Sequence, residues 1–149
     1  MEEFKKAAVY VMTPFTSPKR ADGSGIWVFE FPRAGKPAYT ADGIVTLKGV
    51  TKNEASLLTL TAVLEKITEP VVLKVYLDDR WTADMISRNL TTWAANGFRK
   101  KDGEPVAHSE EWKQIHGFMK RHPVVTVQAA GEHSYKKWMA AELKRRKTA

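Results

Sequence analysis

Hydrophobic and polar positions alternate along the chain with two periods, and these periods predict its elements. Short apolar runs rich in β-branched and aromatic residues predict strands, whereas apolar residues three or four positions apart predict helices. The predicted strands cover residues 7–12, 26–31, 38–47, 71–77 and 124–127. The predicted helices run from Thr51 to Ile67 and over residues 82–89, 90–95, 110–121 and 135–147.

Turn-forming residues separate the first three strands. Residues 16–25 are rich in Gly, Ser and Pro and end directly before the second strand, so residues 22–24 (Asp-Gly-Ser) are interpreted as a turn. Residues 42–43 (Asp-Gly) predict a break or a bulge in the third strand. Short connections between these strands predict an antiparallel meander.

The chain after the meander predicts helices and parallel strands. Thr51 and Glu54 have the spacing of a capping box. The near-continuous apolar run 71–77 is typical of a strand covered on both faces, and a helix that ends before Pro70 would connect to it as a parallel crossover. Ser109 is placed to cap the helix that follows it.

The predicted order is β-β-β-α-β-α-α-α-β-α. It indicates a three-layer α/β fold with a mixed five-stranded sheet, three antiparallel strands followed by parallel strands, and helices on both faces. No repeat or long linker divides the sequence, so we expect residues 1–149 to form one domain.

Charge and composition narrow the function. The chain has 24 Lys and Arg against 17 Asp and Glu, a net charge of +7, which favours polyanions such as nucleic acid or an anionic membrane. Without cysteine it has no disulfide, thiolate zinc site or catalytic cysteine. Acids near the N-terminus are unlike a signal peptide, and no apolar run approaches the roughly 20 residues that span a bilayer. We therefore expect a soluble, cytoplasmic protein.

Three stretches resemble the ribonuclease H type 1 family. They are VTKNEASLLTLTAVLEKI (50–67), VVLKVYLDDRW (71–81) and LTTWAANGFRKKDGEPVAHSEEWKQI (90–115), which together resemble the family's long helix, its central strand and its basic handle loop. The resemblance implies a ribonuclease H-like fold. It also implies cleavage of the RNA strand of an RNA/DNA hybrid with two divalent cations, Mg²⁺ or Mn²⁺.

The family's four metal-binding acids are only partly present. At the matching positions this chain has Thr13, Ser56, Asp78 and, for the fourth acid, either Ala141 or Glu142 depending on the alignment. Two Mg²⁺ ions require several carboxylates, so the resemblance implies a site in which most catalytic carboxylates are replaced. Asp78 alone would hold at most one weakly bound ion.

Two further acids are candidates for a rebuilt site. Asp79 lies where the family usually has serine; it either adds a second metal-binding oxygen beside Asp78 or caps the next helix. Glu132 stands at the position of the family's catalytic loop histidine, with His133 one residue later.

The matching binding surface gains positive charge. Thr51 and Asn53 match positions that contact phosphate and sugar in the family, and Lys52 and Arg80 replace neighbouring amides. Trp81 stands at an aromatic position, in contact with sugar or packed in the core. The phosphate-binding candidates of the handle loop are Arg99, Lys100 and Lys101.

Three hypotheses follow. The first is a catalytically degenerate ribonuclease H-like protein that binds an RNA/DNA hybrid or duplex through its backbone. The second is an active metal-dependent hybrid ribonuclease that uses Asp78, Asp79 and Glu142. The third is a protein-interaction scaffold. The oligomeric state is open.

Overall fold

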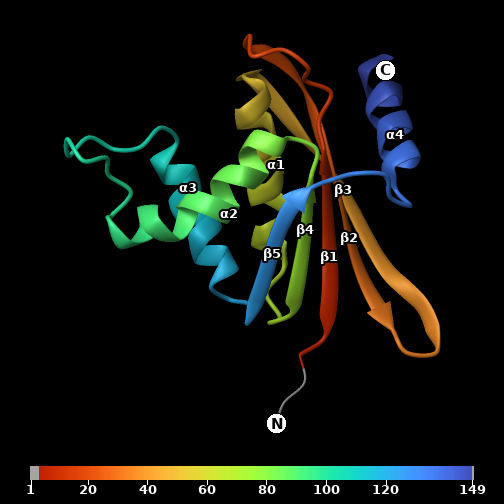
Figure 1. The fold of residues 1–149 in the computed structure, drawn as a ribbon. Coiled ribbons are helices and arrows are strands. Elements are labelled where there is room, and N and C mark those ends of the chain that lie inside the picture. Colours follow the sequence, from red (N-terminus) through yellow and green to blue (C-terminus); the bar gives the residue numbers. More distant parts are fainter. Residues whose placement is uncertain (1–3, 149) are drawn as a thin grey trace.

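The computed structural model describes residues 4–148, and in this part of the chain four helices surround a five-stranded sheet (Figure 1). The strands are β1 (Lys6–Met12), β2 (Ala21–Arg33), β3 (Lys36–Val50), β4 (Val72–Leu77) and β5 (Val124–Ala129). The helices are α1 (Lys52–Lys66), α2 (Arg80–Ala95), α3 (Ser109–Met119) and α4 (Lys136–Thr148).

The sheet has the predicted mixed topology. Its strand order is β3-β2-β1-β4-β5. The pairs β1–β2 and β2–β3 are antiparallel, whereas β1–β4 and β4–β5 are parallel. The antiparallel meander and the parallel crossover through α1 are therefore both confirmed. Residue Val11 of β1 stands opposite Leu77 of β4, so these two strands end at the same edge of the sheet.

Successive side chains of β1 point to opposite faces of the sheet, and each face packs against a different hydrophobic cluster. Val9 and Val11 are buried in the core cluster that contains the inward leucines of α1, and Trp112 of α3 packs in the same cluster. Tyr10 and Met12 point to the opposite face, where they pack against a smaller cluster with Met139 of α4. Figure 1 shows α1, α2 and α3 on one side of the sheet and α4 on the other. The three-layer prediction is confirmed.

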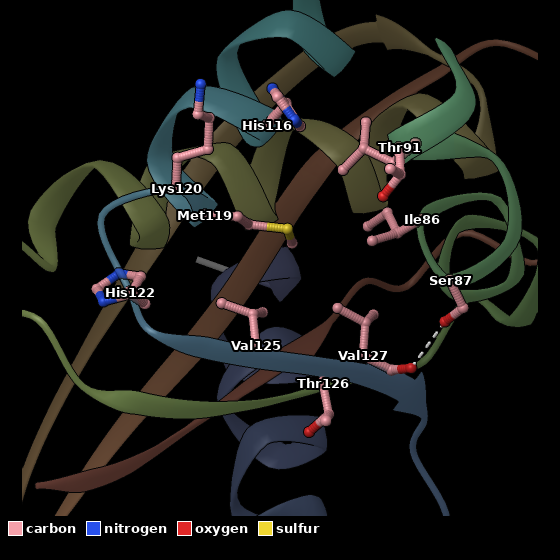
Figure 2. Close-up of a pocket in the computed structure, with 11 residues that line it drawn as sticks. Ile86, Ser87, Thr91, His116, Met119, Lys120, His122, Val125, Thr126 and Val127 are labelled. Atoms are coloured by element: carbon pink, nitrogen blue, oxygen red, sulfur yellow. Dashed lines mark hydrogen bonds between the residues drawn. The ribbon is translucent and has the colours of Figure 1, made fainter. Parts of the chain in front are cut away.

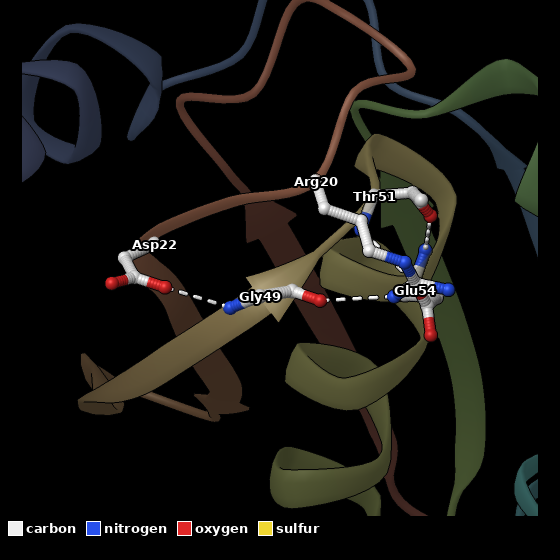
Figure 3. A network of polar contacts seen from close by, with 5 residues as sticks. All are labelled: Arg20, Asp22, Gly49, Thr51 and Glu54. Carbon is white, nitrogen blue, oxygen red and sulfur yellow. Dashed lines mark hydrogen bonds and ion pairs between the residues drawn. The ribbon is translucent and has the colours of Figure 1, made fainter.

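A capping box and an ion pair fix the start of α1. The side chain of Thr51 accepts a hydrogen bond from the Glu54 amide at 3.2 Å, and Glu54 accepts one from the Thr51 amide at 3.0 Å. Arg20, which precedes β2, donates to Glu54 at 2.8 Å and to the Gly49 carbonyl at 2.9 Å (Figure 3). The predicted capping role of Thr51 and Glu54 is confirmed.

The turn predicted at residues 22–24 is wrong, because these residues belong to β2. Gly23 pairs with Leu47 of β3, and a register shift at Asp22 marks a bulge. The Asp22 carboxylate accepts the Gly49 amide at 2.7 Å, across the strand pair (Figure 3). A bulge tolerates the same small polar residues as a turn, so local composition does not distinguish them.

The break predicted at residues 42–43 is also wrong. Asp42 and Gly43 pair in register with Val28 and Trp27. Glycine is needed there for space: a Cβ on Gly43 would lie 2.5 Å from the indole of Trp27. The glycine thus marks close packing rather than the end of a strand.

Three details of the later elements differ from the prediction. Residues 82–95 lie in one helix, α2, rather than in two. Ser109 does not cap α3; His108 holds the cap position in a left-handed conformation without a side-chain cap. The two faces of β4 are unequally covered, since Leu73, Val75 and Leu77 are buried whereas Val72 and Tyr76 are half-buried and Lys74 is exposed.

Candidate carboxylate site and basic surface

Asp78 follows β4 at the edge where β1 also ends. Its amide donates to the Val11 carbonyl at 3.2 Å, which extends the parallel pairing by one residue. Its Oδ2 atom accepts the Thr13 amide at 2.7 Å and lies 3.4 Å from the Thr13 hydroxyl. Thr13, matched from the sequence alone to the family's first acid, therefore presents its amide and hydroxyl to Asp78.

This environment raises the pKa of Asp78 from 3.8 to about 6. Burial of the carboxylate is the main cause, the neighbouring Asp79 charge adds to it, and the Thr13 amide opposes it. The residue as a whole nevertheless keeps contact with solvent.

Asp79 caps α2. Its residue is 2% exposed, and its Oδ2 accepts the amide of Thr82 at 3.2 Å and the hydroxyl of Thr82 at 2.5 Å. The other oxygen, Oδ1, lies 3.7 Å from the ammonium nitrogen of Lys52. Of the two roles that the sequence left open for Asp79, the structure shows the cap. The N-termini of α1 and α2 meet here.

These contacts do not fit a pair of divalent cations. Mg²⁺ needs several free carboxylate oxygens, but Asp78 and Asp79 accept protein donors and Lys52 adds positive charge. Ser56, matched from the sequence alone to the family's second acid, is fully buried, and its hydroxyl has no hydrogen-bond partner among the described residues. Within residues 4–148 no group of three or more His, Asp or Glu side chains is arranged to hold a metal ion.

The two remaining acidic candidates form ion pairs with lysine or arginine. Glu132 is exposed and lies 2.7 Å from Lys136, whose hydrogen bond and charge lower the Glu132 pKa. Glu142, on α4, is 2.6 Å from Arg145. Neither appears with Asp78 or Asp79 in a metal-binding group of the described part. Asp79 lies beside Asp78 because the two residues are consecutive in the chain. Among the described residues, neither Glu132 nor Glu142 joins them in a cation site.

The predicted binding residues surround the same two helix N-termini. Thr51 and Asn53 are half-buried at the start of α1, and Lys52 keeps 43% of its side-chain surface exposed beside Asp79. Arg80 is the first residue of α2 and is exposed. Trp81 is 40% exposed and its ring centre lies 6.2 Å from that of Trp112, so it both packs and faces solvent.

The handle loop between α2 and α3 projects away from the sheet (Figure 1). Phe98 is buried at its base, and a bridge pairs Arg99 with Pro105. The Arg99 guanidinium donates to the Gly103 carbonyl at 2.9 Å, so this arginine also closes the loop. Lys100 and Lys101 are exposed near its tip.

Sequence reasoning missed a cavity beside Thr13. It measures about 960 Å³ and lies between the segment that joins β1 to β2 and helix α4. Its lining includes Phe15 and three cations, Lys19, Lys48 and Lys144. Lys19 stands in the Gly-, Ser- and Pro-rich stretch 16–25, and Lys48 lies near the end of β3. No local pattern in the sequence therefore places both lysines at one cavity.

A second cavity, of about 450 Å³, lies between α2, α3 and β5 (Figure 2). Apolar side chains of β5 and α2 form its walls, and the Ser87 hydroxyl donates to the Val127 carbonyl at 2.9 Å. His122, also in its lining, is buried and accepts the Val71 amide at 3.2 Å. Burial lowers the pKa of His122, and the nearby Arg121 charge adds to this, so the neutral ring is favoured. This cavity contains none of the candidate site residues.

No helix in residues 4–148 is long and apolar enough to span a membrane.

Among curated proteins, the chain is similar in sequence to several bacterial ribonucleases H. No protein-family model matches the chain. The ribonuclease H of Mesorhizobium japonicum is 30% identical over 74 residues, which cover 50% of this chain and 42% of that protein. The ribonuclease H of Rhodopirellula baltica is 28% identical over 107 residues, 68% of this chain and 66% of that protein. The matches span about half the length of most of these relatives, as with the 49% covered in the Xanthomonas campestris protein.

Comparison with solved structures gives a similarity over nearly the whole chain. LC9-RNase H1, a type 1 RNase H with the type 2 active-site motif, superposes with a TM-score of 0.76 at 16% identity, covering 97% of this chain and 73% of that one. The foamy viral protease-reverse transcriptase in complex with an RNA/DNA hybrid gives 0.71 at 13% identity, covering 94% of this chain and 19% of that one. These superpositions show that the fold is ribonuclease H-like.

Proposed function

We propose that this chain, whose fold is ribonuclease H-like, binds the sugar-phosphate backbone of an RNA/DNA hybrid or duplex and does not cleave it by the two-metal route. The proposed lack of two-metal cleavage rests on one observation: the Thr13 amide donates a hydrogen bond of 2.7 Å to Oδ2 of Asp78. Two-metal hydrolysis depends on carboxylates that bridge both cations, and a donor in that place weakens the site. On this proposal residues 1–149 act as one domain, in the cytoplasm.

Exposed lysine and arginine side chains support the proposed binding of a sugar-phosphate backbone. Lys52 and Arg80 stand at the converging N-termini of α1 and α2, and Lys100 and Lys101 stand on the projecting loop. Such side chains neutralise phosphates without reading bases, so we expect affinity to depend weakly on sequence. The structural neighbour that holds an RNA/DNA hybrid makes a hybrid the first ligand to test.

The dependence of nucleic-acid affinity on salt concentration measures the number of phosphate contacts. About four phosphate contacts predict that the logarithm of affinity falls with the logarithm of salt with a slope of about −3 to −4. Between about 50 and 200 mM salt, affinity for a labelled hybrid should then fall roughly a hundredfold. Fluorescence anisotropy with hybrid, double-stranded DNA and double-stranded RNA gives both the slope and the preference.

A cleavage assay separates the proposal from its alternatives. The same labelled hybrid is incubated with Mg²⁺ or Mn²⁺, and we expect the RNA strand to stay intact. Cleavage that disappears in Asp78→Asn would instead establish an active enzyme with a rebuilt site. Binding that is absent for every nucleic acid, or insensitive to salt, would favour a protein-interaction scaffold.

A further inference from the structure

The Asp79 carboxylate satisfies its charge entirely within the protein. Its side chain is 3% exposed, so a charge there needs partners. One oxygen accepts two hydrogen bonds from Thr82, and the other lies 3.7 Å from the ammonium nitrogen of Lys52. The lysine is thus the cation nearest to a buried anion, at the edge of the sheet where β1 and β4 end.

The position of Lys52 is unfavourable for α1 itself. It is the first residue of that helix, where the macrodipole places partial positive charge and favours acids over bases. The capping box of Thr51 and Glu54 already satisfies the local amides without it. What offsets the unfavourable charge is the ion pair across to α2. This indicates that Lys52 serves the carboxylate of Asp79 rather than its own helix.

We propose that the Lys52 ammonium is a built-in counter-ion, which occupies the cation position at this carboxylate edge in place of a divalent metal. A metal ion that approached Asp79 would have to displace Lys52 from the one oxygen that Thr82 leaves open. It would then meet Asp78 with one oxygen already bonded to Thr13. Lys52 keeps 43% of its side-chain surface exposed, so pairing with Asp79 still leaves it able to contact a phosphate. The two proposals are tested by different measurements, so each can fail without the other.

The proposal predicts that removing one positive charge creates a cation site. In Lys52→Gln the Asp79 oxygen loses its ammonium partner, and Asp78 and Asp79 together attract a divalent ion. We expect Mn²⁺, titrated without nucleic acid and followed by electron paramagnetic resonance, to bind Lys52→Gln at least about tenfold more tightly than the unaltered protein. Lys52→Arg keeps the charge and should bind Mn²⁺ as weakly as the unaltered protein.

Two controls make the gain specific. Lys113→Gln removes the same charge from an exposed lysine that pairs with Glu110 on α3, and it should leave Mn²⁺ binding unchanged. Adding Asp79→Asn to Lys52→Gln should abolish the gain, and asparagine keeps the helix cap because it caps as well as aspartate.

Three results would overturn the proposal. The first is that Lys52→Gln and the unaltered protein bind Mn²⁺ equally well, or that neither binds it. The second is that Lys113→Gln gains as much Mn²⁺ affinity as Lys52→Gln. The third is that the gain in Lys52→Gln persists when Asp79→Asn is added. If Lys52→Gln does not fold, the unaltered protein decides: its melting temperature should not change with millimolar Mn²⁺, and a rise that Asp79→Asn removes contradicts the built-in counter-ion.

Discussion

The Thr13 amide donates a hydrogen bond of 2.7 Å to Asp78, across 65 positions of sequence. The bond forms because β1 and β4 run parallel and end together, with Val11 opposite Leu77. It places a backbone donor beside the carboxylate at the edge of the sheet where both strands end. The Asp78 carboxylate therefore accepts a hydrogen bond from the segment that follows β1.

The raised pKa of Asp78 gives a pH-dependent stability. The folded protein holds this proton more tightly than the unfolded chain, because the pKa rises from 3.8 to about 6. The stabilisation is therefore complete below about pH 4 and is lost as pH rises through about 6. Asp78→Asn removes the titration, so its stability relative to the unaltered protein should increase from about pH 4 to about pH 7. Urea unfolding across this range measures it, and a pH-independent difference would contradict the shift.

The capping box predicts a modest cost at Thr51. Thr51→Ala removes the acceptor for the Glu54 amide and should lower the free energy of unfolding by about 1 kcal/mol. Thr51→Ser keeps the hydroxyl and should cost much less. Urea unfolding of both variants compares them under identical conditions, and equal losses would show that the methyl group, not the cap, matters.

Close packing of the sheet against α1 predicts a larger cost at Gly25. A Cβ there would lie 2.0 Å from the Thr59 hydroxyl, so Gly25→Ala should destabilise by about 3 kcal/mol. Adding Thr59→Ala should recover part of this loss because it removes the clashing atoms. As a matched control, Gly117→Ala in α3 meets nothing within 4 Å and should stabilise by about 1 kcal/mol. Thermal unfolding would refute the packing argument if both alanines behaved alike.

A hydrogen bond between Tyr135 and Glu30 connects the start of α4 to β2. Burial and this carboxylate raise the pKa of Tyr135 to about 12, so its hydroxyl stays a donor at neutral pH. Tyr135→Phe should lower the free energy of unfolding by about 1 to 2 kcal/mol. In Glu30→Gln the same Tyr135→Phe change should cost less. A double-mutant cycle tests this, and a coupling energy near zero would show that the bond contributes nothing.

The handle loop predicts a salt-dependent change in binding. Lys100→Gln with Lys101→Gln should weaken hybrid binding for every sequence and make the salt slope shallower by about 2. Lys36→Gln with Lys66→Gln removes the same charge at exposed positions outside the loop, at the start of β3 and the end of α1, and should change little. Anisotropy titrations at several salt concentrations distinguish contact from net charge; equal effects of the two pairs would exclude a specific role for the loop.

The sequence by itself determined the order of the strands and most helices, and with it the fold. Apolar spacing in α1 and the β-branched runs of β1 and β4 are local patterns, and Thr51 and Glu54 interact within one turn, so their outcome follows without the rest of the chain. It also located Asp78 at the end of a strand. Residues 22–24 show the limit of local composition, since the same residues suit a turn and a bulge.

Only the tertiary structure decided how the carboxylates are used. The donors of Thr13 reach Asp78 through the register of two strands, and Lys52 reaches Asp79 because two helices begin at the same edge. Each contact joins segments far apart in the chain, where no residue pattern records the distance, so the electrostatics of the site follow from the fold and not from the motif.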